Sequence, residues 1–487
     1  MSKSEAVSSP VWEVSEPNTK IDNSTIEKEW QEIRENRSDL SGVNTMTLYT
    51  TDREAYYLPS EAMVEVNCEV LKADGSTVLS DTDYTALIGN GFGLFEQISL
   101  KLDEQKIAQV DKPGVAHHLK SLVEYSKDYA DSVAEKQWFY PDDAPEGNDI
   151  AVDTSRFVGV GGTGPAGYYP TGQFHEVQYN VSGATGGALS GTVTAPSIRK
   201  NPDFNSAFKK RVERCWHSNG RLGVNQIFLP MAEIFPILAQ YGRVLKGSRL
   251  QMDFQKIQNT PEAFFGDNTG SMNPIVKIHS MAMWLPRLRP SLEVRAKLDR
   301  QLASNSKIEL AYEHLQHYYD VNRANATGEH RFRVVSEMAR PLRALVAIRK
   351  ATRKSTYDEN SLQFDIGNIT SIQMRVNGRQ FPEESYDVSG TKGHARILHD
   401  LHQLGQKDAD LENGSLLNYK NWKEQYPIFG FDLSHLPQDA FQSKSIADLE
   451  VRITGDAGAN YDVHVVLVSE RKLSIDLVSN HTKFKML

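Results

Sequence analysis

The second half of this chain repeats, in the same order, motifs that occur in its first half. Residues 59–66 (PSEAMVEV) are similar to residues 341–348 (PLRALVAI), and residues 98–107 (ISLKLDEQKI) are similar to residues 372–381 (IQMRVNGRQF). Single short matches arise by chance, but matches that keep their order are the signature of a structural unit used more than once. The repetition therefore predicts two copies of one fold within a single chain.

After each of these hairpin-like segments the chain continues in the same way, with a helical segment, an Ile-Phe strand and an alternating closing strand. The corresponding pairs are 117–128 with 394–408, 227–228 with 428–429, and 275–284 with 461–468. The offset between the copies becomes smaller after residues 141–200, a stretch rich in Gly, Ser, Thr and Pro. We therefore expect an elaborate surface loop inserted in the first copy only.

The periodicity within each copy predicts β-structure. Residues 63–70 (MVEVNCEV) alternate apolar and polar side chains, as a strand with one buried face does. A unit of many short strands, with one conspicuous helix after a hairpin, favours a jelly roll over an immunoglobulin-type sandwich. The predicted fold class is all-β: two consecutive eight-stranded jelly rolls, a double jelly roll, with short helices and a long loop insertion in the first.

The polar and acidic start of the chain reads as an arm. Residues 24–27 (STIE) form a capping box, which opens a helix, and Ile26, Trp30 and Ile33 then follow with helical spacing. This pattern predicts a short amphipathic helix whose apolar stripe docks on the same chain or on a neighbour. The predicted organisation is an N-terminal arm (1–44), a first jelly roll (45–290, with the Gly-rich insertion 141–200), a linker (291–328) and a second jelly roll (329–487).

Composition narrows the classes of function. Lys and Arg number 54 against 63 Asp and Glu, a net charge of −9, and such a chain lacks the clustered cations that neutralise nucleic-acid phosphates. The short basic clusters 209–211 and 287–289 are interpreted as solvated faces or inter-subunit partners. The two cysteines exclude a disulfide scaffold and are expected to be buried and reduced. We expect no secretory signal, since the N-terminus has no apolar core of about 7–15 residues, and no membrane span, since no apolar run approaches about 18 residues.

Motifs that carry chemistry are incomplete in this sequence. The Gly-rich run 158–167 (VGVGGTGPAG) has no Gly-Lys-Ser/Thr after it. His314 and His317, and His399 and His402, have helical metal-ligand spacing without a third ligand, so polar helix faces explain them. The strand around His464 lacks the His-x-His pair of catalytic jelly rolls. Ser218 and Ser434 adjoin His217 and His435 in sequence, which does not make a triad. We predict no catalytic, cofactor or metal site, and no enzyme.

The order of several segments resembles the double jelly-roll major capsid proteins of polinton, adintovirus and virophage-like viruses. The segments that carry the resemblance are 94–102 (LFEQISLKL), 118–128 (HLKSLVEYSKD), 227–236 (IFLPMAEIFP) with 244–247 (VLKG), 284–286 (WLP) with Pro290, and 431–434 (FDLS) with the strands up to Asp476. Together they cover most of residues 45–480. The arm and the insertion 141–200 have no counterpart in this comparison.

The resemblance implies a structural role in a virion. It implies a homotrimer whose six jelly rolls form a pseudo-hexagonal capsomer, which then joins neighbouring capsomers and minor or penton capsid proteins in an icosahedral shell. It also implies an outward insertion that helps lock the trimer, and an inward arm that contacts an inner membrane or inner layer. No sequence-specific nucleic-acid contact is expected. The protein would lie in the virion capsid, after assembly in the host cytoplasm or nucleus.

Three other interpretations remain open at this point. A carbohydrate-binding β-sandwich would need exposed aromatics on a concave sheet, for which Tyr168-Tyr169 and Tyr318-Tyr319 are candidates. A jelly-roll enzyme would need a metal cluster. A minor, vertex-forming capsid protein would usually carry one jelly roll, whereas this chain is predicted to carry two.

Overall fold

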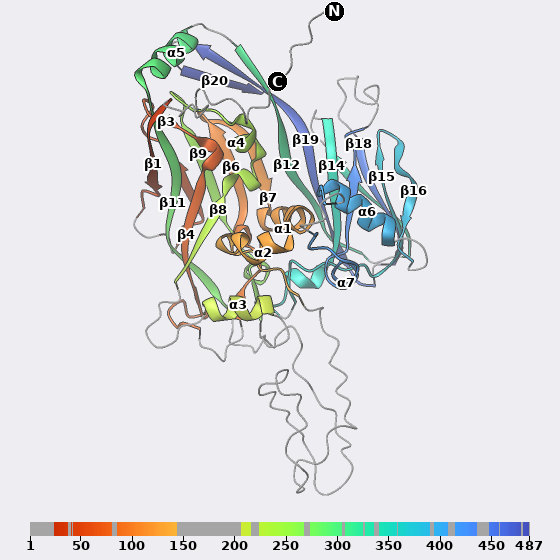
Figure 1. Ribbon diagram of the computed structural model, residues 1–487. Helices are drawn as coiled ribbons and strands as arrows, with labels where there is room; N and C mark the ends of the chain where they lie inside the picture. Colours follow the sequence, from red (N-terminus) through yellow and green to blue (C-terminus); the bar gives the residue numbers. More distant parts are fainter. Residues whose placement is uncertain are drawn as a thin grey trace, which may run out of the picture.

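The computed structural model consists mainly of β-strands arranged in two bodies that lie side by side (Figure 1). It describes residues 24–37, 40, 42–79, 85–143, 206–215, 224–266, 273–303, 307–324, 327–335, 340–357, 359–389, 394–407, 414–435, 448–456, 458–478 and 481–486. The predicted insertion therefore lies outside the described residues from residue 144 to residue 200.

The first body is built from a five-stranded and a four-stranded antiparallel sheet, and it also contains a two-stranded sheet of β5 (Thr85–Leu87) and β10 (Phe264–Gly266). Its strands are β1 (Thr25–Arg34), β2 (Thr45–Tyr49), β4 (Met63–Leu71), β6 (Phe95–Leu102), β7 (Gln105–Asp111), β8 (Val224–Pro230), β9 (Leu250–Lys256) and β11 (Ile275–Pro290). One sheet has the order β1-β11-β4-β8, and the other has the order β2-β9-β6-β7. The short strand β3 (Tyr56–Tyr57) pairs with the end of β11. Eight strands that alternate in this way between two packed sheets form a jelly roll.

The second body repeats this topology strand for strand. Its strands are β12 (Lys307–Arg323), β13 (Gly328–Val335), β14 (Arg340–Lys350), β15 (Asn368–Val376), β16 (Arg379–Asp387), β17 (Ile428–Asp432), β18 (Asp448–Asp456) and β19 (Tyr461–Val478). The two sheets have the orders β12-β19-β14-β17 and β13-β18-β15-β16. The final strand, β20 (His481–Met486), pairs with β19. The predicted duplication and the double jelly roll fold are confirmed.

Alternation of side chains decides which face of each strand enters the core. In β4, Val64, Val66, Cys68 and Val70 are fully buried between the two sheets of the first roll. Met63 and the other intervening residues point away from that core. Burial of one apolar face against the partner sheet is the main stabilising term for such a sandwich.

The two predicted hairpins form around turns of the same type. Asp103 and Glu104 have φ of 48° and 71° between β6 and β7, and Asn377 and Gly378 have φ of 47° and 84° between β15 and β16. Two consecutive residues at positive φ make a type I′ turn, whose twist matches that of the flanking strands. Asn-Gly is the preferred pair, whereas Glu104 adopts a conformation that costs a non-glycine residue about 1–2 kcal/mol.

Short helices cover the ends and the facing sides of the rolls. They are α1 (Pro113–Glu124), α2 (Lys127–Asp131), α3 (Ser206–Cys215), α4 (Pro236–Tyr241), α5 (Leu292–Ala303), α6 (His394–Leu404) and α7 (Tyr419–Glu424). Helices α1 and α6 are the predicted helices that follow the hairpins, and Leu119, Leu122 and Val123 of α1 are buried as expected. None of the helices in the described ranges has the length and apolar character that crossing a membrane requires.

The predicted arm helix is wrong, because residues 25–34 form strand β1. The strand pairs antiparallel with β11, with Trp30 opposite Pro286 and Ile33 opposite Met283. An isolated helix of this length is marginal in water, whereas β11 offers an open edge with a ladder of hydrogen bonds. Ile33 packs on the core, Trp30 lies on the opposite, outward face and Ile26 falls at an exposed bulge, so the three residues of the helical stripe do not share one face of the strand.

The predicted linker 291–328 also contains regular structure. It holds helix α5 and most of strand β12, which pairs along its length with β19. Each jelly roll thus begins earlier than predicted, near residue 25 and near residue 307. In both rolls the missed element is the first strand, which lies at the edge of its sheet. The apolar pattern of β1 is weak because this edge strand is largely exposed, whereas that of β12 is interrupted by the polar residues His314 and His317, which are buried in the seam.

Candidate functional site

The most elaborate polar arrangement in the described residues lies in the seam between the two rolls. The outer face of the sheet β12-β19-β14-β17 rests against the first roll, through contacts of β12 with β7 and α4, and of α1 with β14 and β19. Two short 3-10 helices also meet there, η7 (Thr260–Glu262) and η8 (Ala351–Lys354). Polar groups that are buried in this way must pair with one another.

Two stacked imidazoles occupy the middle of the seam. His317 on β12 and His464 on β19 lie with ring centroids 5.2 Å apart and planes 7° from parallel, and their ring nitrogens Nε2 and Nδ1 are 3.1 Å apart. Nδ1 of His317 lies 2.9 Å from the carbonyl oxygen of Asp111, at the end of β7 in the other roll. Burial lowers the pKa of His317 to about 4 and also lowers that of His464 well below its usual value. Both rings are therefore neutral at neutral pH.

An arginine beside these imidazoles joins the rolls by charge. Arg349, at the end of β14, contacts Glu262 of the first roll at 3.2 Å and Asp462 of its own roll at 3.0 Å, and it donates to the Ser361 carbonyl at 2.9 Å. Lys112, which precedes α1, contacts the same Glu262 carboxylate at 2.5 Å. Burial alone would raise the pKa of Glu262, but the cations hold it below its usual value. The network thus keeps its carboxylates charged.

A second buried junction centres on Asp142. Its carboxylate accepts from Arg211 of α3 at 2.6 Å and from the side-chain amide of Asn360 in the second roll at 2.5 Å. Its carbonyl oxygen accepts from the Tyr426 hydroxyl, also of the second roll, at 3.1 Å. Arg211 also donates to the Tyr140 carbonyl. One carboxylate therefore joins segments from both rolls in a water-excluded place.

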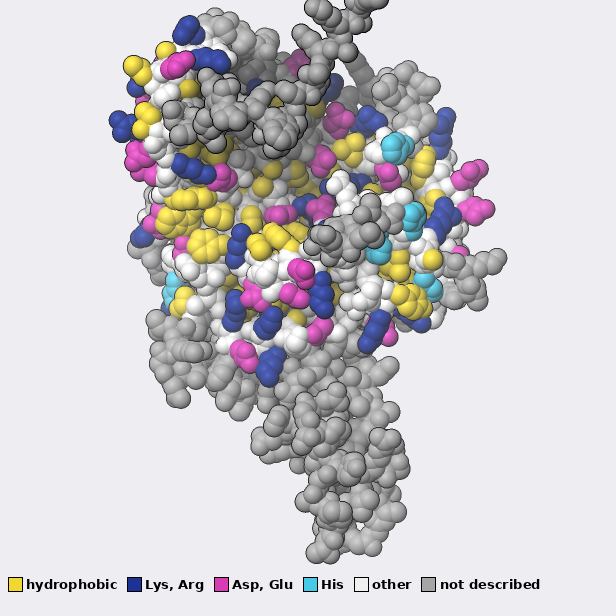
Figure 2. Space-filling model, viewed as in Figure 1, with side chains coloured by type: hydrophobic (Ala, Val, Ile, Leu, Met, Phe, Trp, Pro, Cys, Tyr) yellow, Lys and Arg dark blue, Asp and Glu magenta, His cyan; other side chains and the backbone are white. Residues whose placement is uncertain are grey.

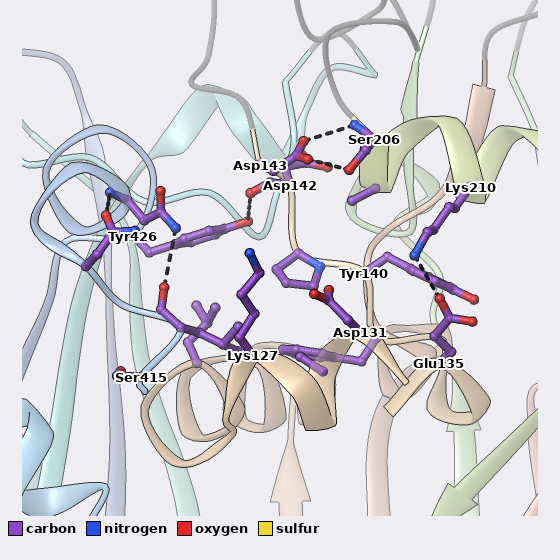
Figure 3. Close-up of a pocket in the computed structure, with 18 residues that line it drawn as sticks. Lys127, Asp131, Glu135, Tyr140, Asp142, Asp143, Ser206, Lys210, Ser415 and Tyr426 are labelled. Atoms are coloured by element: carbon purple, nitrogen blue, oxygen red, sulfur yellow. Dashed lines mark hydrogen bonds and ion pairs between the residues drawn. The ribbon is translucent and has the colours of Figure 1, made fainter. Parts of the chain in front are cut away.

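A cavity of about 330 Å³ lies next to this junction (Figure 3). The first roll contributes α2 and the start of α3, and the second roll contributes Ser415 and Tyr426. Lys127 points into the cavity, while Lys210 and Glu135 pair at 2.9 Å on its wall and Asp143 accepts from Ser206. The described lining holds no His or Cys side chain that would serve as base or thiol nucleophile.

The histidines singled out from spacing lie in different settings. The interpretation of His314 and His317 as a polar helix face is wrong: both lie on strand β12 and are buried, and burial lowers the pKa of His314 to about 3. His399 and His402 do lie on helix α6. His464 faces the seam and not the interior of its own roll. Within the described ranges, no group of three or more His, Cys, Asp or Glu side chains has the geometry to hold a metal ion.

The remaining candidates do not assemble into a site. Ser434 donates to Asp432, and the ring of His435 is largely exposed 3.9 Å from the same carboxylate. His217, Ser218, the Gly-rich run 158–167 and Tyr168-Tyr169 lie outside the described residues. Tyr318 is half-buried and Tyr319 stacks on His317. Cys68 and Cys215 are buried and free, as predicted.

The interpretation of residues 209–211 as a solvated face is wrong for Arg211. This guanidinium is fully buried, because it pairs with the Asp142 carboxylate, which also accepts from Asn360 of the second roll. Sequence reasoning also missed Arg349 and Asp462, although each places a charge within a strand of apolar residues. Such an interruption of an apolar run is the signal that predicts a buried charged partner.

Comparison with known proteins gives the following findings. A family model described as a double jelly roll-like domain matches residues 173–472. The fold is similar to a chain in the cryo-EM structure of the Sputnik virophage, with a TM-score of 0.56 and 11% identity, over 99% of this chain and 93% of that one. It is also similar to the Faustovirus major capsid protein, with a TM-score of 0.50 and 8% identity, over 93% and 91% of the two chains. No curated protein sequence matches the chain.

Proposed function

Because the chain belongs to the double jelly roll-like domain family, we propose that it is a major capsid protein, a structural subunit of a viral shell. The observation that carries this proposal is the use of one eight-stranded topology twice, with the two copies held in a fixed relation by buried charges. The similarity to the Faustovirus major capsid protein in fold supports it. The role proposed here is that of a rigid building block and not of an enzyme.

A shell subunit must keep its shape while it makes many modest contacts. The seam meets this need, because separating the rolls would break the buried contacts of Arg349 with Glu262 and of Asp142 with Asn360 and Tyr426. The two rolls therefore act as one wedge. A wedge with two different ends associates head to tail, and a head-to-tail contact that closes after a whole number of copies makes a ring.

We propose that three chains close such a ring, so that six jelly rolls form a pseudo-hexagonal capsomer of an icosahedral shell. Neighbouring capsomers and minor or penton capsid proteins would be its further partners. Its place would be the virion capsid, after assembly in the host cytoplasm or nucleus. The residues before β1 remain the proposed contact with an inner layer or inner membrane.

The surface is consistent with a protein that does not wrap nucleic acid. On the face shown in Figure 2, Lys and Arg side chains are interspersed with Asp and Glu and do not gather in one basic patch. The net charge of −9 keeps free subunits apart and soluble. Contact with a packaged genome would therefore fall to another component.

Electron microscopy of the purified full-length chain, together with mass by light scattering, tests this proposal. We expect particles with the mass of three chains and a pseudo-hexagonal outline, and closed shells or sheets at higher concentration. Chains that remain monomeric across the accessible range of concentration and salt would contradict it.

A further inference from the structure

Within the chain, the two rolls already make one contact of the kind that a ring must repeat. The outer face of the sheet β12-β19-β14-β17 is covered by β7 and α1 of the first roll. Leu315 and Val466 on this face are 1% exposed, and Leu345 is 7% exposed. Arg343, at its margin, reaches Glu124 of α1 at 2.9 Å. The second roll thus presents a sheet face, and the first roll presents a strand and a helix.

The first roll carries the same sheet face, but nothing in the described residues covers it. The row His317–Val466–Leu345 across β12, β19 and β14 corresponds to the row Glu32–Trp284–Met63 across β1, β11 and β4. Trp30 lies two residues before Glu32 on β1, just as Leu315 lies two residues before His317 on β12. Trp30 is 44% exposed, whereas Leu315 is buried. Ile26, at a bulge near the start of β1, is 65% exposed.

The second roll carries the other half of the contact, also uncovered in the described structure. Helix α1 is buried around almost its whole surface, whereas its counterpart α6 buries only Ile397 and Leu401. Strand β7 buries Ile107, Ala108 and Val110, whereas its counterpart β16 buries only Tyr386 and exposes the segment Glu383, Glu384 and Ser385. A helix buried on all sides lies between two packed layers, so the exposed side of α6 corresponds to a layer that is missing.

We propose that the outer face of β1 and β11, centred on Trp30, docks on β16 and α6 of a second copy of this chain. The contact would repeat between chains what the sheet face of the second roll does on β7 and α1 within the chain. Each copy carries the uncovered sheet face on its first roll and the uncovered strand and helix on its second roll. The contact therefore joins the first roll of one copy to the second roll of the next, in a head-to-tail arrangement. This inference rests on the proposed function, since it names the surface by which the capsomer closes.

Polar groups on the β1 face are already paired, so the face can be buried without stranding a charge. Lys28 contacts Glu61 at 2.7 Å, and Arg34 contacts Glu32 at 2.7 Å. Glu65 accepts from the indole of Trp284 at 2.6 Å. What remains for a partner is apolar surface around Trp30 and Ile26, and burial of a large aromatic is the usual centre of a binding contact.

The charges at the margin also suit a second copy. Position 61, which carries Glu, corresponds to Arg343 in the repeat, so the sign is reversed on the sheet side. On the helix side, α1 offers the acid Glu124 to Arg343, whereas the exposed residues of α6 include Arg396 and His399 and no acid. At this one corner of the contact, between position 61 and α6, the signs therefore remain opposite, while Glu61 also pairs with Lys28 and β16 carries the exposed acids Glu383 and Glu384.

Photo-crosslinking in the full-length chain tests the contact directly. A benzophenone amino acid replaces Trp30, and isotopically light and heavy chains are mixed before irradiation so that mass spectrometry separates intermolecular from intramolecular products. We expect intermolecular crosslinks to peptides within residues 379–404. Crosslinks confined to residues 1–23 of the same chain, or to surfaces of a second copy outside β16 and α6, would overturn the inference.

A matched pair of variants gives a second readout. Trp30→Glu and Val133→Glu each place a carboxylate at a residue that is 44% exposed, but Val133 lies on the 3-10 helix Val133–Gln137 and not on β1 or β11. We expect Trp30→Glu to weaken self-association more than tenfold by sedimentation, with unchanged circular dichroism, and Val133→Glu to leave it unchanged. Equal effects of the two variants would overturn the docking surface.

The two proposals fail in different ways. If the wild-type chain never self-associates, the proposed function fails and no second copy reaches the β1 face. If the wild-type chain forms trimers while the crosslinks map elsewhere, only the docking inference fails.

Discussion

Replacement of Arg349 by methionine is the sharpest test of the seam as the element that makes two jelly rolls one rigid block. The guanidinium is 1% exposed and contacts Glu262 across the seam and Asp462 within its roll. Methionine keeps the volume of the aliphatic stem but leaves both carboxylates short of one cation. Loss of one partner of a buried ion pair usually costs about 3–5 kcal/mol.

The structure places the expected value at the lower end of that range. Lys112 still contacts Glu262, and Lys354 still contacts Asp462 at 2.9 Å, so neither carboxylate is stranded. We therefore expect a loss of about 3 kcal/mol in the free energy of unfolding. Adding Asp462→Asn to Arg349→Met should cost less than the sum of the two single losses, because the charges belong to one network.

Equilibrium urea unfolding, followed by tryptophan fluorescence and circular dichroism, measures this change. The matched control is Arg331→Met, which removes an arginine from a surface pair with Glu329 whose side chains are 58% and 42% exposed. Such a pair is worth at most about 1 kcal/mol. If Arg349→Met is no more destabilising than Arg331→Met, the seam does not hold the rolls together in the way argued here.

Three other predictions follow from the same structure. Stability should fall as pH drops from about 6.5 toward 4, since the unfolded chain binds protons that the buried rings of His317 and His464 reject, and His317→Gln should flatten this slope in thermal melts taken at each pH. Gly405→Ala should cost about 1–3 kcal/mol in urea unfolding, because a Cβ there would lie 2.2 Å from the Val123 carbonyl oxygen of α1, whereas Gly414→Ala, with open space around it, should be nearly neutral; equal melting curves would contradict this packing. Cys68 and Cys215 should resist an aromatic disulfide reagent until urea unfolds the chain, because burial raises the pKa of both thiols; fast labelling of the native protein would refute that.

Local patterns predicted the elements whose partners lie nearby in the sequence. The hairpin around Asn377 and Gly378 follows from turn chemistry, and the inward residues of β4 follow from alternation around Val64 and Val66. Helix α1 follows from its apolar stripe and begins at Pro113, a residue suited to the first turn. The duplication itself could be predicted because both copies keep these local motifs in the same order.

Such local patterns did not predict the first strand of each roll. Residues 25–34 have the spacing of a helix, and they become strand β1 because β11, far along the chain, offers an open edge. The same holds for β12, whose partner β19 closes the chain. Pairing over such distances depends on where the rest of the fold brings the edges, which no local window contains.

The sequence alone determined that one β-rich unit occurs twice, where its two hairpins and the helices after them lie, and which residues of β4 face inward, because short-range turn chemistry and side-chain periodicity are properties of neighbouring residues. Only the tertiary structure decided which charges are buried together, as with Arg349, Glu262 and Asp462. It also decided that the sheet face of the second roll is covered within the chain while Trp30 of the first is exposed. Burial depends on which surfaces the folded rolls bring together. Equivalent strands of the two rolls can therefore differ in burial, because one of them contacts the other roll and the other does not.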